Sequence, residues 1–150
     1  MPTLYGRKKL LFLVVDDGEL GKADAKTEFA KGVVTISVER SVRDQARLGV
    51  GRARMTLAHE LAHAVMHHGT PLFRLISEVG PTALAKETAY ESAEHQAKVF
   101  AAAFLIHDED AALMRDAEEI SAQFGVSIEA ARICRSRLQK KAERCGASMR

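Results

Sequence analysis

Two short apolar runs in the first forty residues indicate β-strands. The run LLFLVV (10–15) is continuous and rich in residues that favour strands. In GVVTISVE (32–39), the apolar residues Val34, Ile36 and Val38 alternate with polar ones, which is the pattern of a half-buried strand. The segment DDGELGKAD after the first run is expected to form a loop. We predict that the two strands pair, with room for a further short strand between them.

From Ser41 the apolar positions follow a helical repeat, and Gly49 and Gly51 mark a possible break in it. Within residues 52–68 the apolar positions form a nearly continuous stripe, so this helix is expected to be buried on much of its surface. Gly69, followed closely by a proline, is expected to end it.

The rest of the chain is expected to hold three more helices. After the connection TPLFRLISEVGP, an alanine-rich helix follows Pro81 and ends near His107. Asp108 is the expected N-cap of a helix over DEDAALMRDAEEISAQF, and Ser127 that of a last helix from Ile128 to about Arg144. The pattern as a whole predicts an α+β fold, with a small N-terminal antiparallel or mixed sheet packed on a mainly helical body.

Composition narrows the class of protein. A chain of 150 residues that is 47% apolar is expected to form one domain over residues 1–150. Its two cysteines, Cys134 and Cys145, lie eleven apart in a helical stretch, which fits reduced thiols better than a disulfide framework. Because no secretory signal is recognised and no apolar run reaches the length of a membrane span, we expect a cytoplasmic protein without membrane contact.

Charge is small overall but uneven. The formal net charge of +2 gives no general signal for a polyanionic partner. From Arg132 to Arg150, however, there are seven Lys or Arg residues and one acid, Glu143. Basic tails can bind nucleic acid. We interpret this one as a solvated helix face that ends in a loose terminus over about residues 140–150.

The segment TLAHELAHAVMHH contains the sequence His-Glu-x-x-His at His59, Glu60 and His63. Residues four apart share one face of a helix, so the two imidazoles can hold one Zn²⁺ ion together. Glu60 lies on the flank of that face, where its carboxylate can take a proton from zinc-bound water and pass it to a leaving amine. His67 and His68 are interpreted as a polar helix end, whose charge suits the helix dipole.

The third metal ligand is expected to come from another helix, because three ligands along one helix would not converge on a tetrahedral ion. One class of zinc peptidases has a glycine and a third histidine after the motif, but Met66 and Gly69 occupy those positions here. The segment YESAEHQAKVFAAAFLI offers Glu91, Glu94 and His95.

Glu94 shares a helix face with Ala97 and Ala101, and these small residues would let the helix approach another closely. By spacing, that face continues to Phe104 or Leu105. Glu91, one turn earlier, is the main rival of Glu94 as a ligand. A solvated acidic turn is the alternative interpretation of both glutamates.

Three blocks of sequence together resemble the ImmA/IrrE family of bacterial metallo-endopeptidases. They are RARMTLAHELAHAVMHHG, ESAEHQAKVFAAAFLI and ISAQFGVSIEAARICRSRL, and the resemblance covers about residues 33–139. It implies a zincin-like fold whose helical body carries the His-Glu-x-x-His helix. It also implies one Zn²⁺ ion held by His59, His63 and Glu94, as in glutamate-liganded, thermolysin-like enzymes, with Glu60 as the general base.

The chain departs from the family pattern at three positions. Ala62 replaces the usual glycine inside the motif, which is a small change, and His107 stands where proline is usual. Lys98 replaces an asparagine or aspartate that can orient a histidine ligand by accepting a hydrogen bond. A lysine ammonium cannot accept one, so this departure bears on catalysis more than on metal binding.

The resemblance implies regulatory proteolysis, typically of a helix-turn-helix transcriptional repressor. The partner would be a protein presented as an extended strand at the edge of the N-terminal sheet. One alternative is a DNA-binding regulator, because ISAQFGVSIEAARICRSRL resembles a helix-turn-helix with Arg132, Arg135 and Arg137 on its second helix. Another is a metal-binding but inactive regulatory partner, for which Lys98 is the sequence hint.

Overall fold

The computed structural model describes residues 9–66 and 83–147, and its first part is a three-stranded mixed sheet. The strands are β1 (Lys9–Val15), β2 (Ala25–Ala30) and β3 (Val33–Glu39), in the order β1-β3-β2. β1 runs parallel to β3, and β2 is antiparallel to it. The two predicted strands therefore do pair, and the short strand predicted between them in sequence is β2.

A two-residue hairpin joins β2 to β3. Its residues, Lys31 and Gly32, have φ angles of 48° and 76°. Positive φ at both positions matches the right-handed twist of the flanking strands, and it sets the register in which Ala30 faces Val33. This register turns Val34, Ile36 and Val38 of β3 to one face of the sheet, where all three are buried.

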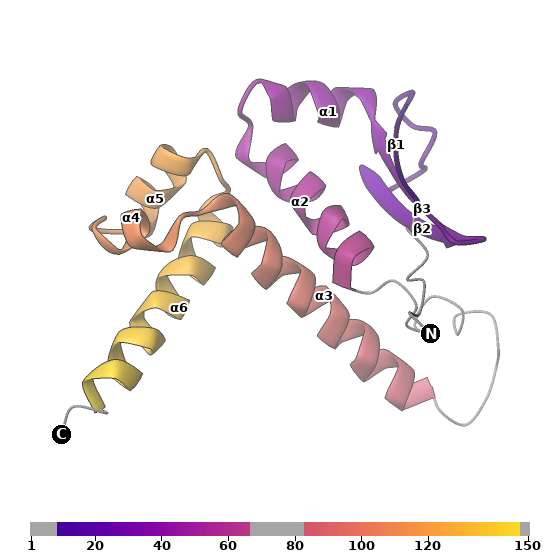
Figure 1. Cartoon of the computed structure of the whole chain (residues 1–150). Helices are drawn as coiled ribbons and strands as arrows, with labels where there is room; N and C mark the ends of the chain where they lie inside the picture. The colour runs from indigo at the N-terminus through magenta and orange to yellow at the C-terminus, as the bar shows by residue number, and fades with distance from the viewer. Residues whose placement is uncertain (1–8, 67–82, 148–150) are drawn as a thin grey trace, which may run out of the picture.

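That face packs on two helices, α1 (Arg40–Arg47) and α2 (Gly51–Met66). Val38 packs with Val42 of α1 and Ala53 of α2, while Val34 and Ile36 pack against Ala64 of α2. The predicted break between the two helices lies at residues 48–50, and Gly51 is the first residue of α2. In Figure 1 the sheet and these helices form one end of the molecule.

The long helix α3 (Ala83–Leu105) connects that end to the C-terminal helices (Figure 1). It packs against α2 through alanines, of which Ala97 and Ala101 are completely buried. The prediction that small residues let this helix approach another is therefore confirmed. Leu105 continues the packed face, whereas Phe104 is 61% exposed.

The remaining helices are α4 (Asp108–Ala112), α5 (Ala117–Phe124) and α6 (Ile128–Ala147). The prediction of a single helix over residues 108–124 is therefore wrong, because the structure has two helices there. The carboxylate of Asp116 accepts a hydrogen bond from the backbone N–H of Glu119 at 2.8 Å and so begins α5 as its N-cap. Asp108 is the first residue of α4, whose N-cap is His107.

The last helix begins as predicted and ends later. The hydroxyl of Ser127 accepts a hydrogen bond from the backbone N–H of Ala130 at 3.2 Å, which caps α6. The helix continues to Ala147, so most of the segment expected to be a loose tail is helical, and residues 148–150 lie outside the described part. Within the described ranges, no helix has the length and apolar character needed to cross a membrane.

Gly51 marks a close contact between α2 and the turn before α6. A Cβ atom at this position would lie 2.5 Å from the carbonyl carbon of Val126 and 2.8 Å from the backbone nitrogen of Ser127. Backbone atoms of a packed turn cannot move aside cheaply. We therefore expect Gly51→Ala to lower the free energy of unfolding by about 1–3 kcal/mol, measured by urea denaturation.

Gly146→Ala is the matched control, because a Cβ atom there meets nothing within 4 Å. Its free energy of unfolding should stay the same or rise by less than about 1 kcal/mol. Equal stabilities of the two variants would contradict the close contact at Gly51.

Candidate active site

Helix α2 presents His59 and His63 on one face, one turn apart. Their Nε2 atoms are 3.0 Å from each other, and the two rings meet edge to face. His63 is buried, with 4% of its surface exposed, and it lies between the buried residues Ala62 and Ala64. The i, i+4 spacing thus aims two ring nitrogens at one point beside α3.

Helix α3 brings Glu94 to the same point. One carboxylate oxygen lies 2.9 Å from Nε2 of His63, and the other lies 3.1 Å from Nε2 of His59. The fully buried Ala97, one turn further along α3, leaves room for this approach of the two helices. Among the described residues, His59, His63 and Glu94 are the group whose ligand atoms, all within 4.8 Å of one another, could hold a metal ion.

The three side chains fit a zinc ion in both spacing and chemistry. Zinc–ligand bonds of about 2.0–2.1 Å in a tetrahedral site place any two ligand atoms about 3.3 Å apart. The observed separations of 2.9–3.1 Å are within a few tenths of an ångström of that value. Two imidazoles and one carboxylate are also the donor set of catalytic zinc sites that keep a fourth position for water or substrate.

Glu60 is held toward the sheet rather than toward the other helices. The hydroxyl of Thr27, in β2, donates a hydrogen bond to Oε2 of Glu60 at 2.7 Å. The same hydroxyl oxygen lies 3.0 Å from the backbone carbonyl oxygen of Glu60. Because one oxygen of the carboxylate is occupied in this way, the other is left to accept a proton.

Thr27 is a site residue that the sequence did not indicate. It belongs to the strand AKTEFA, whose position was expected only as a short element between two others. A single threonine in such a strand carries no chemical pattern of its own. Only the packing of β2 on α2 brings it to Glu60.

The other residues considered as ligands lie apart from this cluster. Glu91 and His95 are both exposed, and neither belongs to the group that could hold a metal ion. Lys98 is also exposed and lines a pocket that reaches His59 and the start of α6. His67 and His68 lie outside the described residues.

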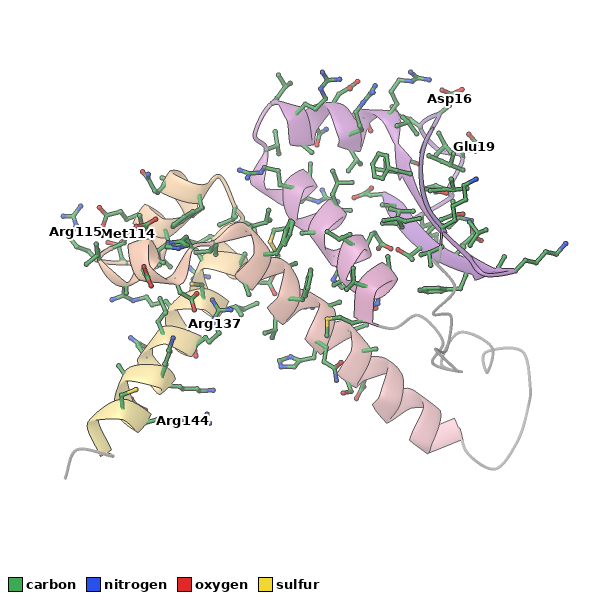
Figure 2. All side chains as sticks on the ribbon, viewed as in Figure 1. Asp16, Glu19, Met114, Arg115, Arg137 and Arg144 are labelled. Atoms are coloured by element: carbon green, nitrogen blue, oxygen red, sulfur yellow. The ribbon has the colours of Figure 1, made fainter. Side chains whose placement is uncertain are left out.

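Two of the three arginines of the helix-turn-helix-like segment contact other residues of the C-terminal helices and their connections. Arg135 donates a hydrogen bond to the carbonyl oxygen of Met114 at 3.2 Å. Arg137 is paired with Asp108 of α4, and Figure 2 shows its position on α6. Arg132, in contrast, is exposed. Two of the three cations proposed for DNA contact therefore already have partners within the chain.

Neither cysteine takes part in a disulfide. Cys134 is completely buried in the core formed by α3 to α6, and burial raises the pKa of its thiol, although the nearby Arg137 acts in the opposite direction. A thiol with a raised pKa stays protonated and is a poor nucleophile or metal ligand at neutral pH. The side chain of Cys134 therefore serves packing, which agrees with reduced cysteines.

Comparison with known proteins places the chain in a family of peptidases. The model of the IrrE N-terminal-like domain, a peptidase family, matches residues 28–134, which is more than two thirds of the chain. The protein therefore belongs to this family, and the resemblance to ImmA/IrrE proteins is confirmed. The matched range contains α2, α3 and the three side chains that could bind a metal. No curated protein and no solved structure matches the chain.

Zinc affinity can show whether Glu94 or Glu91 is the metal ligand. We expect Glu94→Ala to weaken zinc affinity by at least about 100-fold, since even the loss of an outer hydrogen-bonding partner costs 10- to 100-fold. Competition with a chromophoric chelator would measure this. Glu91→Ala is the control, one turn away and exposed, and its affinity should match that of the unaltered protein. If Glu91→Ala weakened zinc affinity and Glu94→Ala did not, Glu91 would be the ligand in place of Glu94.

Proposed function

We propose that the protein is a zinc-dependent endopeptidase. The observation that carries this proposal is the convergence of His59, His63 and Glu94 beside Glu60, whose carboxylate is held by Thr27. The peptidase family to which the chain belongs supports the same reaction. Imidazole nitrogens are ligands that suit zinc, which supports this metal. Among the described residues, one such cluster is found, which supports one ion.

When bound, a zinc ion would act as a Lewis acid that polarises a peptide carbonyl and lowers the pKa of water. His59, His63 and Glu94 would hold it, and all three must be deprotonated to do so. Binding of the ion therefore competes with protonation of the two imidazoles. The carboxylate of Glu94, which lies close to both imidazoles, would supply the negative charge that a dication needs.

Glu60 would move the proton during cleavage. Its carboxylate accepts a proton from the attacking water and delivers it to the nitrogen of the leaving amine. The hydrogen bond from Thr27 restricts rotation of the carboxylate, so the accepting oxygen stays in one position. Thr27 is thus a positioning residue, which acts through Glu60.

The substrate would bind along the free edge of β2. In the described part of the sheet, β2 is an edge strand, and its Thr27 contacts Glu60 directly. An extended peptide that pairs with β2 through backbone hydrogen bonds would therefore pass beside Glu60. We propose that this peptide belongs to a helix-turn-helix transcriptional repressor, as the resemblance to ImmA/IrrE proteins implies.

Replacement of Glu60 tests the reaction. We expect Glu60→Gln to lower cleavage of the cognate repressor by about 10²- to 10⁴-fold while zinc content is unchanged, because the amide cannot accept the proton. Candidate repressors are those encoded beside the gene, and cleavage would be followed by mass spectrometry. Removal of zinc with a chelator should abolish cleavage, and added zinc should restore it.

The alternatives give different results in the same assay. Full activity of Glu60→Gln would exclude Glu60 as the general base. Zinc binding without cleavage of any candidate would favour the inactive metal-binding partner. Specific duplex DNA binding that survives removal of zinc would favour the DNA-binding regulator.

Replacement of Thr27 separates positioning from metal binding. We expect Thr27→Val to lower kcat roughly 10- to 100-fold, which corresponds to the loss of one hydrogen bond to a charged group. Zinc content and KM should stay close to those of the unaltered protein. Thr27→Ser is the control, because it keeps the hydroxyl and should keep most of the activity. Equal activity of the valine and serine variants would show that this hydrogen bond plays no part in catalysis.

A further inference from the structure

Strand β1 exposes large apolar side chains on both of its faces. Five consecutive residues are at least 37% exposed: Leu10 52%, Leu11 37%, Phe12 52%, Leu13 47% and Val14 37%. Strands with apolar residues on both faces normally lie inside a sheet that is covered on each side. Single exposed apolar residues are common on protein surfaces, but a contiguous run of five indicates an interaction site.

β1 is also an edge of the sheet. It pairs with β3 on one side, and no described residue forms a backbone hydrogen bond with its other side. An apolar edge strand with free N–H and C=O groups is a template for another strand. Natural edge strands are usually protected by charges, prolines or bulges, and residues 10–15 contain no charge and no proline.

The charges at the two ends of β1 select the partner strand. Lys9 stands at its beginning, while Asp16 and Asp17 follow its end, where Arg40 pairs with Asp16 and a net negative charge remains. Figure 2 labels Asp16, the residue that directly follows β1, at the upper end of the sheet. An antiparallel second copy of β1 would bring unlike charges together at both ends, whereas a parallel copy would bring like charges together. The strand is therefore complementary to itself in the antiparallel direction.

We propose that β1 pairs with β1 of a second copy of this chain, in an antiparallel dimer with a continuous six-stranded sheet. A two-fold axis perpendicular to the sheet keeps each face of one strand on the same side as that face of the other. The register that pairs all of residues 9–15 places Phe12 opposite the partner's Phe12. Leu11 then faces the partner's Leu13, and Lys9 faces the partner's Val15, the last residue before that strand's acidic end.

In this dimer the two edges of the sheet have different roles. The β1 edge joins two copies, while the β2 edge stays free and carries the contact from Thr27 to Glu60. The same pairing brings the partner's Phe12 to an apolar groove lined by Leu10, Leu57 and Phe104. The proposal does not depend on the peptidase function, because no residue of the metal cluster belongs to β1.

Molar mass in solution gives the first test. The chain has a mass of 16.4 kDa, so light scattering after size exclusion should report about twice that value in the micromolar range. A mass of one chain up to submillimolar concentration would overturn the proposal.

Paired substitutions test the register. Leu11→Glu together with Leu13→Glu places like charges opposite each other at two positions of the dimer, so dissociation should increase at least about 100-fold. Leu11→Glu together with Leu13→Lys is the matched control, since it places unlike charges at the same two positions and should keep the dimer. Dimers of equal strength from both double variants would place the interface elsewhere.

Cross-linking tests the register without introducing charge into β1. In a Cys145→Ser background, Phe12→Cys should form an intermolecular disulfide under mild oxidation, because the two substituted positions meet at the two-fold axis. Leu10→Cys should not, because it faces the partner's Val14. A preference of Leu10→Cys over Phe12→Cys would overturn the proposed register.

Discussion

The close packing of α2 on α3 is the constraint on which the site depends. The group that could hold a metal ion takes two side chains from α2 and one from α3, so the distance between the helices sets the distances between the ligand atoms. Metal–ligand bonds tolerate changes of only about 0.2 Å. Ala62 and Ala97 are both completely buried, so a larger residue at either position would force the residues packed around it to move. The methyl group of Ala62, where the family usually has glycine, is fully accommodated within this packing.

The sheet contributes to the site through the other flank of α2. His59 and His63 face α3, while Glu60 faces β2, so two sides of one helix carry the proposed metal ligands and the proposed general base. This division follows from helix geometry, since adjacent residues on a helix point about 100° apart. The core between β3 and α2 keeps the strand and the helix at a fixed distance. The hairpin that places β2 therefore also determines where Thr27 meets Glu60.

The parts of the site that follow from local spacing could be predicted from the sequence. The helical repeat alone predicts that His59 and His63 share one face. The switch in apolar periodicity after β3 alone predicts the α+β class. Glu94 and Glu91 could not be separated by spacing alone, because they lie almost one turn apart and the crossing of α2 and α3 decides between them. Thr27 and the break between α4 and α5 depend on tertiary packing and on one capping carboxylate, respectively, which apolar periodicity does not reveal.

Lys98 stands where the family pattern has asparagine or aspartate, and its position determines how this replacement affects the site. Glu94 and Lys98 are four residues apart on α3, which is the favourable spacing for a helical ion pair. Such a pair would draw the carboxylate away from the histidines and would compete with a metal ion for its charge. In the structure both oxygens of Glu94 lie beside the histidines, and Lys98 forms no hydrogen bond or ion pair with a described residue. The substitution therefore removes a possible hydrogen-bond acceptor but leaves the charge of Glu94 available to a metal ion.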